Sequence, residues 1–414
     1  MKERLSKKAI KFKRTISPVR EIMNFADHDF IKKLGLDPND LISFAGGWVN
    51  HKAPADLMEV YVEIVSDERL FHQSGAYSPT LGSREVKEAI CAFEEHVYGL
   101  HDLNPKQVAV GQSSTQMTSA LFQVLLDPGD RLLMLDPSYC NYPMQLVTTL
   151  DAHIIRFPVL DVDAWTYRAD ERLGDLTRTI LREQPKMILL VAPDNPTSQI
   201  LSTEFVRETV SAAEKVGAFV AVDFAYKSIV FGGNYPEYFS WAPRDNFLSI
   251  HSNSKWSKNL GRRMGWVEAP EFVVEALEST LNSSILCPDS LHQMAFSRFV
   301  VKAIKADTLR PYIKDTIRRY HEAAKFLVSA IREHLDFPAL VPSGGIYTVT
   351  PVGKDGASFV DKVLRSTGVL FVPGWGFGST MRNAVRISYG PLVNDLEIID
   401  RGLRRVGDFL RKNR

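Results

Sequence analysis

Residues 186–226 read KMILLVAPDNPTSQILSTEFVRETVSAAEKVGAFVAVDFAY. This stretch begins and ends with a short apolar run, and an amphipathic segment of helix length lies between the two runs. Strands this apolar, joined through a helix, are typical of parallel strands that are buried on both faces of a sheet. The stretch therefore predicts a strand–helix–strand unit of an α/β fold.

The same alternation extends to both sides of this unit. Further apolar runs are QVAVG (107–111), DRLLMLDPSY (130–139), AHIIRFPV (152–159) and NFLSI (246–250). Helix-length amphipathic segments separate most of them, so the pattern repeats the strand–helix–strand unit. We predict an α/β domain over residues 51–300, with a mostly parallel central sheet flanked by helices.

The last third of the chain has a different pattern. Two long charged helical segments, 311–335 and 394–413, flank the short strand-like pieces GIYTVTPV (345–352) and AVRISYG (384–390). The full length of 414 residues is too long for one compact core of ordinary size. We predict a smaller α+β domain from residues 301–414, joined by residues 1–50 with an N-terminal arm, because chain termini often lie close together.

The overall composition restricts the partners and the location. The net charge of +1 gives no reason to expect nucleic acid or a membrane surface as a partner, and no apolar run is long enough to span a bilayer. Three dispersed cysteines indicate a reducing compartment rather than a disulfide framework or a zinc cluster. We predict a cytoplasmic protein. The basic first twenty residues lack the apolar segment of a secretory signal and are interpreted as a solvated arm, with a targeting peptide as the alternative.

Polar side chains follow several of the predicted strands. In an open α/β sheet, ligands bind beyond the carboxyl ends of the strands. Ser114 and Thr115 open a helix after the first run, where they would bind a phosphate or simply cap the helix. Asn195 lies in a turn after another strand. Asp223 ends a buried strand, where a carboxylate is costly unless it caps a turn or faces a cationic ligand.

A cluster of cations and hydroxyls follows the run NFLSI. Residues 251–266 read HSNSKWSKNLGRRMGW. A lysine among serines is usually a solvated loop, and Lys258 and Arg262 are predicted to face solvent or another subunit.

Together, these pieces resemble the fold-type I pyridoxal-phosphate enzymes, specifically the class I/II aminotransferases. The resemblance runs from about residue 45 to about residue 390. Its most specific part is Ser252-x-Ser254-Lys255, with Arg263 eight residues after the lysine. Supporting pieces in the family's order are YSPTLGSREVKEAI, SSTQ, DPSYCNY, DNPTS, DFAY, VPGWGFG and VRIS.

The resemblance implies how the cofactor, pyridoxal 5'-phosphate, is held. Lys255 would carry it as a Schiff base, and lysine suits this role because its pKa falls readily on burial or near other cations. Asp223 would pair with the pyridine nitrogen and keep the ring protonated. Ser252 and Arg263 would bind the phosphate, and the Ser114–Thr115 amides and hydroxyls would complete its site.

Other matches would orient the ring and the substrate. Tyr226 and Asn195 would hydrogen-bond the phenolate oxygen of the ring, and Tyr139 would stack on the ring face unless it is a core aromatic residue. Arg386 would clamp the substrate α-carboxylate, the alternative being a structural ion pair. Gly47, with the glycine before it, would lie in a loop over the substrate.

The resemblance also implies an assembly and leaves some positions open. Tyr77 matches a tyrosine that reaches the phosphate of the neighbouring subunit, which implies a homodimer with shared active sites. Ser198 replaces a frequent glycine, and little change is expected from it. Trp48 replaces a smaller residue and would restrict the substrate if it lines the pocket. We assign no second arginine to a side-chain carboxylate, so a dicarboxylic substrate is unsupported.

The predicted function is transfer of an amino group between an α-amino acid and a 2-oxo acid with ping-pong kinetics, in which Lys255 moves the α-proton. The same fold and residues support an alternative, a lyase, cyclase or decarboxylase that uses the same cofactor. A regulator with a DNA-binding domain is disfavoured because the segment before the first motif is short. A nucleotide-dependent dehydrogenase is disfavoured because no Gly-x-Gly-x-x-Gly follows the early strands.

Overall fold

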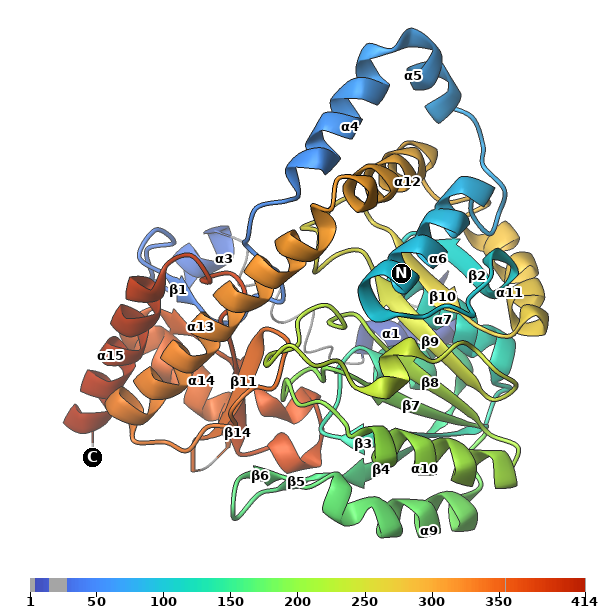
Figure 1. Ribbon diagram of the computed structural model, residues 1–414. Helices are drawn as coiled ribbons and strands as arrows, with labels where there is room; N and C mark the ends of the chain where they lie inside the picture. The colour runs from blue at the N-terminus through green and yellow to red at the C-terminus, as the bar shows by residue number, and fades with distance from the viewer. Residues whose placement is uncertain (1–3, 15–27, 354, 414) are drawn as a thin grey trace.

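A seven-stranded sheet forms the centre of the larger part of the molecule (Figure 1). The computed structural model describes residues 4–14, 28–353 and 355–413. Strand β10 is antiparallel to both of its neighbours, and the other paired strands are parallel, so the predicted mostly parallel sheet is confirmed. The strand order is β2-β10-β9-β8-β7-β3-β4, with bounds β2 Val108–Gly111, β3 Arg131–Asp136, β4 His153–Pro158, β7 Met187–Val191, β8 Phe219–Asp223, β9 Phe247–Ser252 and β10 Gly265–Glu268.

Both faces of this sheet are buried under helices. Successive strand side chains alternate between two apolar clusters: Val222 packs in one cluster and Ala221 in the other. Each large side chain buried in this way contributes about 1.5–3 kcal/mol. The first cluster receives α6 (Arg84–Tyr98), α9 (Leu173–Glu183), α10 (Thr203–Lys215) and α12 (Ser290–Lys305), and the second receives α7 (Ser114–Leu125), α8 (Tyr142–Leu150) and α11 (Glu271–Ser284).

The C-terminal part has its own apolar core around a small antiparallel sheet. Phe44 contributes to this core from the N-terminal side, because β1 (Ile42–Ser43) pairs with β12 (Val369–Leu370). The remaining elements are β11 (Tyr347–Pro351), β13 (Val372–Pro373), β14 (Ala384–Ser388), α3 (His28–Lys33), α13 (Leu309–Leu335), α14 (Gly356–Thr367) and α15 (Leu396–Lys412).

Helix α13 belongs to both cores. Leu309 and Ile313 at its start pack in the first cluster of the large sheet, whereas Tyr320 and the apolar residues up to Leu335 pack in the C-terminal core. One continuous helix of 27 residues therefore joins the two parts of the molecule (Figure 1).

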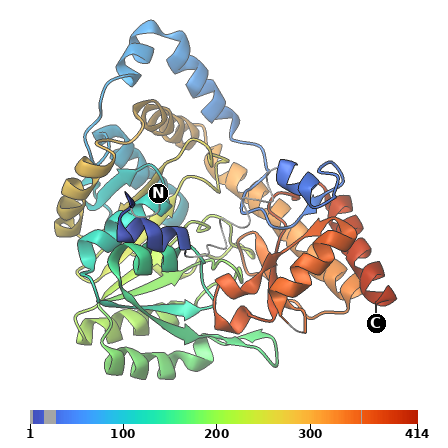
Figure 2. The ribbon, with the colours of Figure 1, turned by 180° about the vertical axis from the view of Figure 1, so that it is seen from behind.

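Two helices, α4 (Ala55–Ser66) and α5 (Glu68–Ser74), project from the body of the molecule in both views (Figures 1 and 2). Short elements complete the described chain. These are the hairpin of β5 (Leu160–Asp161) and β6 (Thr166–Tyr167) and the 3-10 helices η2 (Pro105–Gln107), η3 (Asp170–Arg172), η4 (Glu237–Ser240), η5 (Gly374–Gly376) and η6 (Ser379–Met381).

Part of the basic N-terminal arm forms helix α1 (Lys7–Arg14), which contacts α8 of the large part (Figure 2). Lys11 ion-pairs with Asp151 and donates to the carbonyl oxygen of Val147, so a cation lies at the C-terminus of α8, where the helix dipole favours it. The expectation that the N-terminal segment packs on the C-terminal part therefore does not hold for α1. Residues 15–20 of the predicted arm lie outside the described residues.

A search of the described helices for a membrane span found none that is sufficiently long and apolar.

Candidate active site

A cavity of about 320 Å³ lies where the carboxyl ends of β7, β8 and β9 approach the C-terminal part. Val191 pairs with Asp223, and Asp223 pairs with Ile250, so these strands end at one level. The cavity brings together every predicted cofactor and substrate residue except Tyr77. These are Gly47, Ser114, Thr115, Tyr139, Asn195, Asp223, Tyr226, Ser252, Lys255, Arg263 and Arg386.

The N-terminus of α7 forms one end of the cavity. Ser113 is the N-cap, and its hydroxyl accepts from the amide of Gln116 at 3.2 Å. The side chains of Ser114 and Thr115 line the cavity instead of capping the helix. A Cβ on Gly265 would lie 2.3 Å from the amide nitrogen of Ser114, so a glycine is required for β10 to pass this close behind the turn. The result is a helix N-terminus with hydroxyls, which suits a phosphate.

Ser252 and Arg263 lie at the same end. Ser252 is buried at the end of β9, and its hydroxyl accepts from the amide of Ser254 at 3.2 Å. Arg263 is exposed and lines the cavity, and its Nη1 donates to the carbonyl oxygen of Leu260 at 2.7 Å. The other nitrogens of this guanidinium give the cavity mouth a cation with further donors.

Asp223 forms the acidic part of the cavity wall. It is buried, and its carboxylate accepts from the hydroxyl of Tyr142 at 2.5 Å and from the amide of Ala225 at 2.8 Å. Burial raises the pKa of Asp223, whereas these two hydrogen bonds and the charges of His251 and Lys255 oppose the rise. We did not predict Tyr142, although it is the second tyrosine of DPSYCNY and could have been noticed there.

Lys255 is the cation nearest the centre of the site. Its Nζ donates to the carbonyl oxygen of Gly47 and lies 5.5 Å from the ring centroid of Tyr226. Burial, followed by the charges of Arg386 and Arg263, lowers the pKa of Lys255 to about 8. About a tenth of this amine is therefore unprotonated at pH 7, far more than at the ordinary lysine pKa, and a nucleophile or a base needs this unprotonated form.

Tyr226 is backed by a second tyrosine that the sequence did not reveal. The hydroxyls of Tyr226 and Tyr347 lie 2.7 Å apart, and both rings are buried. Tyr347 comes from β11, where an aromatic residue in an apolar strand reads as part of the core. Tyr139 packs edge-on against Tyr142, with ring centroids 5.2 Å apart, and also lines the cavity.

Arg386 is buried on β14, and its partners are an amide and a carbonyl rather than a carboxylate. Nη1 donates to Oδ1 of Asn195 at 3.0 Å, and Nη2 donates to the carbonyl oxygen of Ala45 at 2.8 Å. Its Nε is buried without a hydrogen-bond partner among the described residues. The guanidinium also lies over the ring of Tyr347 at 4.2 Å. This cation has donors available for a carboxylate in the cavity.

The loop before α4 forms part of the cavity wall through Ala45, Gly47 and Trp48. Trp48 lines the cavity and is 45% exposed. Its indole packs so closely on Gly46 that a Cβ there would lie 2.6 Å from the ring. A glycine at position 46 is therefore what allows the Trp48 side chain to pack against this loop.

Three residues from the sequence analysis lie elsewhere. Lys258 donates to Oδ1 of Asn50, and Arg262 donates to Oδ1 of Asn259, both at 2.8 Å, and neither lines the cavity. Tyr77 is 83% exposed and lines a separate hollow beside α12.

The polar groups of the cavity match the functional groups of pyridoxal phosphate and an amino acid. Lys255 offers an amine for an aldehyde, Asp223 offers a buried acid for a ring nitrogen, and Ser114 with Thr115 offers a phosphate site. The buried, unpartnered Nε of Arg386 fits a carboxylate. We conclude that the residues present fit this cofactor.

Comparison with known proteins gives one family. The family model for aminotransferases of class I and II matches residues 40–402. The L-glutamine–4-(methylsulfanyl)-2-oxobutanoate aminotransferase of Bacillus subtilis (strain 168) is 28% identical over 374 residues, covering 89% of this chain and 89% of that protein. An aspartate aminotransferase of Pyrococcus horikoshii is 24% identical over 355 residues, covering 84% and 86%.

The fold of a solved structure agrees with these matches. A single-mutant form of the Thermus thermophilus aspartate aminotransferase superposes with a TM-score of 0.83 at 22% identity. The match covers 98% of this chain and 99% of that chain. The predicted α/β architecture is therefore confirmed for the whole molecule.

Proposed function

The chain belongs to the class I and II aminotransferases and is a pyridoxal-phosphate-dependent aminotransferase, and from this premise we propose how its own residues divide the work. One observation carries the proposal: a single cavity joins the amine of Lys255, the buried acid Asp223 and the partly unpaired guanidinium of Arg386.

Five groups of contacts would hold the cofactor in this proposal. Lys255 would bind its aldehyde covalently, and Asp223 would keep a proton on its ring nitrogen. The N-terminus of α7, Ser252 and Arg263 would bind its phosphate. Tyr226 and Asn195 would hydrogen-bond the ring oxygen, and Tyr139 would stack on the ring.

When bound, pyridoxal phosphate supplies an electron sink for the negative charge that develops at the substrate α-carbon. As a free amine, Nζ of Lys255 would accept the proton from the substrate α-carbon and would later donate it again, so that Lys255 acts first as the base and then as the acid. Its lowered pKa of about 8 suits both directions of this transfer near neutral pH.

We assign the substrate carboxylate to Arg386. The guanidinium is buried, and its Nε is available, so an α-carboxylate would complete its hydrogen bonding. The cavity residues without a role in this proposal, among them Trp48, Cys140 and Leu260, carry no charge. We therefore infer that the substrate is an α-amino acid with an uncharged side chain and that the acceptor is the corresponding kind of 2-oxo acid.

An absorbance scan of the purified enzyme with a panel of amino acids tests this function. A visible band should bleach toward shorter wavelength with true donors, and a 2-oxo acid should appear as product. Methionine-like and branched amino acids should outperform aspartate, because, of the two guanidinium groups that line the cavity in the described part of the chain, Arg263 is assigned to the phosphate and Arg386 to the α-carboxylate. Release of ammonia with pyruvate would instead support elimination.

The proposal includes a homodimer with shared sites. Met58, Val62 and Val65 are exposed at i, i+4 and i+7 on α4, and Phe71 is exposed on α5, so the projecting arm carries an apolar stripe. We propose that a second copy covers this stripe and that Tyr77 reaches the phosphate of the partner's cofactor.

Subunit complementation tests the shared site. Tyr77→Phe and Lys255→Ala subunits, each weakly active alone, should regain activity when mixed, because one site of the mixed dimer is then intact. A monomer in analytical ultracentrifugation, or no recovery on mixing, would contradict the shared site.

Two further predictions remain part of the proposal. The division into domains 51–300 and 1–50 with 301–414 is supported by the separate apolar cores. A cytoplasmic location is supported by Cys91, Cys140 and Cys287, which are free in the structure. Limited proteolysis tests the first prediction, and cell fractionation tests the second.

A further inference from the structure

Tyr347 lines the cavity but has no role in the proposed reaction so far. It lies on β11, and it is only 1% exposed. In the small sheet it pairs with Ser388, so it is a diagonal neighbour of Arg386 on the same face of the sheet. The register of two strands thus brings an aromatic side chain to the residue assigned to the substrate carboxylate.

The backbone around Tyr347 is fixed to two loops of the cavity. The amide of Tyr347 donates to the hydroxyl of Ser198 at 3.0 Å, in the turn that follows β7. The amide of Gly345 donates to the carbonyl oxygen of Ile229 at 2.8 Å, in the loop that contains Tyr226. A side chain that starts from such an anchored backbone has a defined position, as a positioning role requires.

The hydroxyl of Tyr347 contacts the hydroxyl of Tyr226 at 2.7 Å. Both side chains are buried, and their rings lie edge-on with centroids 5.7 Å apart. Neither hydroxyl has another hydrogen-bond partner among the described residues. Burial raises the pKa of both phenols, so each hydroxyl keeps its proton near neutral pH. Two protons are therefore present for one contact, and one of them remains for a ligand.

The proposed function decides which proton lies between the two tyrosines. A phenol has one proton to donate and can also accept a hydrogen bond. If Tyr226 donates to the ring oxygen of the cofactor, only the proton of Tyr347 is left for the contact between the two hydroxyls. Tyr347 then donates to Tyr226. A hydroxyl that accepts such a bond becomes a stronger donor itself.

The ring of Tyr347 contacts a second part of the site. The guanidinium carbon of Arg386 lies over this ring, 4.2 Å from its centroid, and over the ring of Phe377 at 5.1 Å. The face of an aromatic ring attracts a cation. The donors of a guanidinium lie at its edge, so contact of its face with these rings restrains the group and leaves donors for a carboxylate.

The loop before α4 leaves room for the Tyr347 hydroxyl. A Cβ at position 47 would lie 3.1 Å from this hydroxyl, which is closer than an ordinary van der Waals contact. The carbonyl oxygen of Gly47 also accepts from Nζ of Lys255. A larger residue at position 47 would therefore displace either the Tyr347 hydroxyl or the loop that contacts Lys255.

We propose that Tyr347 is a positioning residue with two tasks: its hydroxyl donates to Tyr226, and its ring restrains the guanidinium of Arg386. This inference rests on the proposed assignment of Tyr226 to the ring oxygen of the cofactor and of Arg386 to the α-carboxylate. Two substitutions separate the tasks. Tyr347→Phe removes only the hydroxyl, whereas Tyr347→Leu removes both the hydroxyl and the ring.

The first experiment is a pH titration of the visible absorbance band of the holoenzyme, which reports the protonation of the link between Lys255 and the cofactor. Loss of that proton leaves negative charge on the ring oxygen, and a stronger donor at Tyr226 stabilises this charge. Tyr347→Phe should therefore raise the pKa of the link by about half a unit. An unchanged titration would overturn the role of the hydroxyl.

Tyr389→Phe is the matched control. Tyr389 is also buried, and its hydroxyl donates to the carbonyl oxygens of Gly344 and Gly345, but it does not line the cavity. The control should leave the titration unchanged, and a shift equal to that of Tyr347→Phe would overturn the proposal. Added to Tyr226→Phe, the Tyr347→Phe change should cause no further shift, because it acts through Tyr226. A further shift of full size would overturn this route.

The second experiment measures the binding of an unreactive carboxylate, 4-methylpentanoate, to the holoenzyme by calorimetry. Tyr347→Phe keeps the ring and should bind this probe within about twofold of the unmodified enzyme. Tyr347→Leu should bind it about five- to tenfold more weakly, whereas both variants should bind pyridoxal phosphate equally. Equal affinity of the two variants for the probe, or equal losses for probe and cofactor, would overturn the role of the ring.

Two further readouts distinguish this failure from failure of the proposed function. A borohydride-stable cofactor adduct on Lys255, with a shifted titration in Tyr226→Phe but none in Tyr347→Phe, would refute only the role of the Tyr347 hydroxyl. Absence of the adduct from the unmodified protein, seen by mass spectrometry, would refute the proposed function and this inference with it.

Discussion

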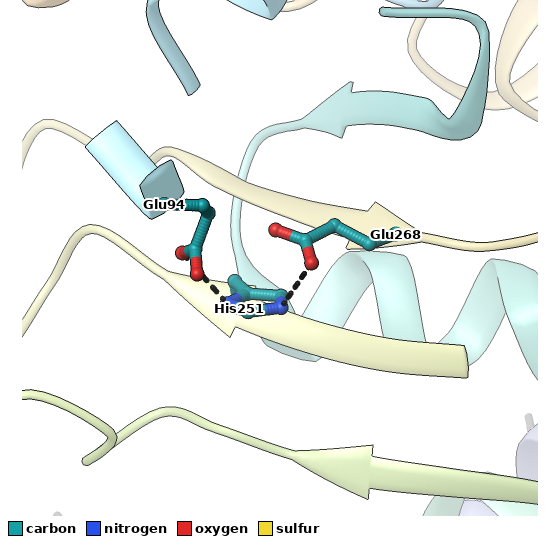
Figure 3. A group of neighbouring side chains, drawn as sticks. All are labelled: Glu94, His251 and Glu268. Carbon is teal, nitrogen blue, oxygen red and sulfur yellow. Dashed lines mark ion pairs between the residues drawn. The ribbon is translucent and has the colours of Figure 1, made fainter. Parts of the chain in front are cut away.

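Charged side chains lie on both sides of strands β8 and β9, but on one side they line an open cavity and on the other side they are buried. On the cavity side, Asp223, Lys255 and Arg386 are brought together, and the Nε of Arg386 has no partner among the described residues. On the other side, Glu94, His251 and Glu268 (Figure 3) lie with Lys227 in a cluster that is closed to solvent, and Oε1 of Glu94 also has no hydrogen-bond partner among the described residues. The difference teaches that charged side chains of the same types can act on a substrate only where a cavity gives the substrate access to them.

Lys255→Ala should produce the largest effect, because it removes both the covalent attachment and the proton carrier. We expect kcat to fall by at least about 10⁴-fold. Borohydride treatment followed by mass spectrometry should find no cofactor adduct on this peptide. Lys258→Ala is the matched control, because Lys258 lies in the same loop but outside the cavity, and its activity should stay within about twofold. A large loss in the control would remove the distinction between the two lysines.

Glu94→Gln should destabilise the buried cluster. It leaves Lys227 buried without a counter-charge, so the free energy of unfolding should fall by about 3–5 kcal/mol, measured by urea denaturation. Adding Lys227→Met should recover most of this loss, because the charges then balance again. If the single variant is as stable as the unmodified protein, the stability of the fold does not depend on the pairing of Lys227 with Glu94.

Arg386→Lys keeps the charge on the cavity side but loses the forked donors. We expect kcat/KM for an amino acid to fall by about 10–150-fold, which corresponds to about 1.5–3 kcal/mol for hydrogen bonds to a charged group. Stability should change little, because the partners of Arg386 are an amide and a carbonyl. A loss of stability with unchanged kcat/KM would place Arg386 among structural residues.

The pH dependence of cofactor attachment should show the lowered pKa of Lys255. Attachment needs the neutral amine, which dominates above the pKa of about 8 and decreases below it. The rate for apoprotein should therefore fall about tenfold from pH 7 to pH 6 and level off above pH 9. Stopped-flow absorbance measures this rate. An inflection near the ordinary lysine pKa would show that the cavity does not depress it.

Ser198 gives the smallest expected effect, at the point where the cavity loop meets β11. Its φ is 56°, and its hydroxyl accepts from the amide of Tyr347 at 3.0 Å. Ser198→Ala loses the hydrogen bond and keeps the unfavourable backbone angle, so it should cost about 1 kcal/mol in thermal unfolding. Ser198→Gly loses the bond but relieves the angle and should be close to neutral. Equal melting temperatures for the two variants would contradict this division.

The residues that line the cavity were predictable from the sequence, whereas the buried cluster of Glu94, His251 and Glu268 was not. Asp223 directly follows one apolar run, Lys255 lies five residues after another, and parallel strands bring such positions to one edge. Glu94 lies in a helix far away in sequence, and Glu268 lies in β10, a four-residue strand that follows the cation-rich loop. Their meeting with His251 depends on tertiary contacts that no local pattern encodes.

Two cavity residues show the same limit on a smaller scale. Tyr347 reads as a core residue because it lies in an apolar strand, and only the register of β11 with β14 brings it to Arg386 and Tyr226. Trp48 was noticed as unusual, but its position over Gly46 required the path of the loop. The residue types were visible in the sequence, whereas their neighbours were not.

Helix α13 sets a mechanical limit on this enzyme. With 27 residues it is about 40 Å long, and one rigid rod is thereby fixed at its first turns to the body that carries Lys255 and along the rest to the body that carries Arg386. The two bodies cannot swing apart freely, because any pivot must occur at the end of the rod or bend it. A substrate that contacts both Lys255 and Arg386 would therefore bind between two bodies that move only a short way relative to each other, in the directions that pivoting or bending of α13 allows.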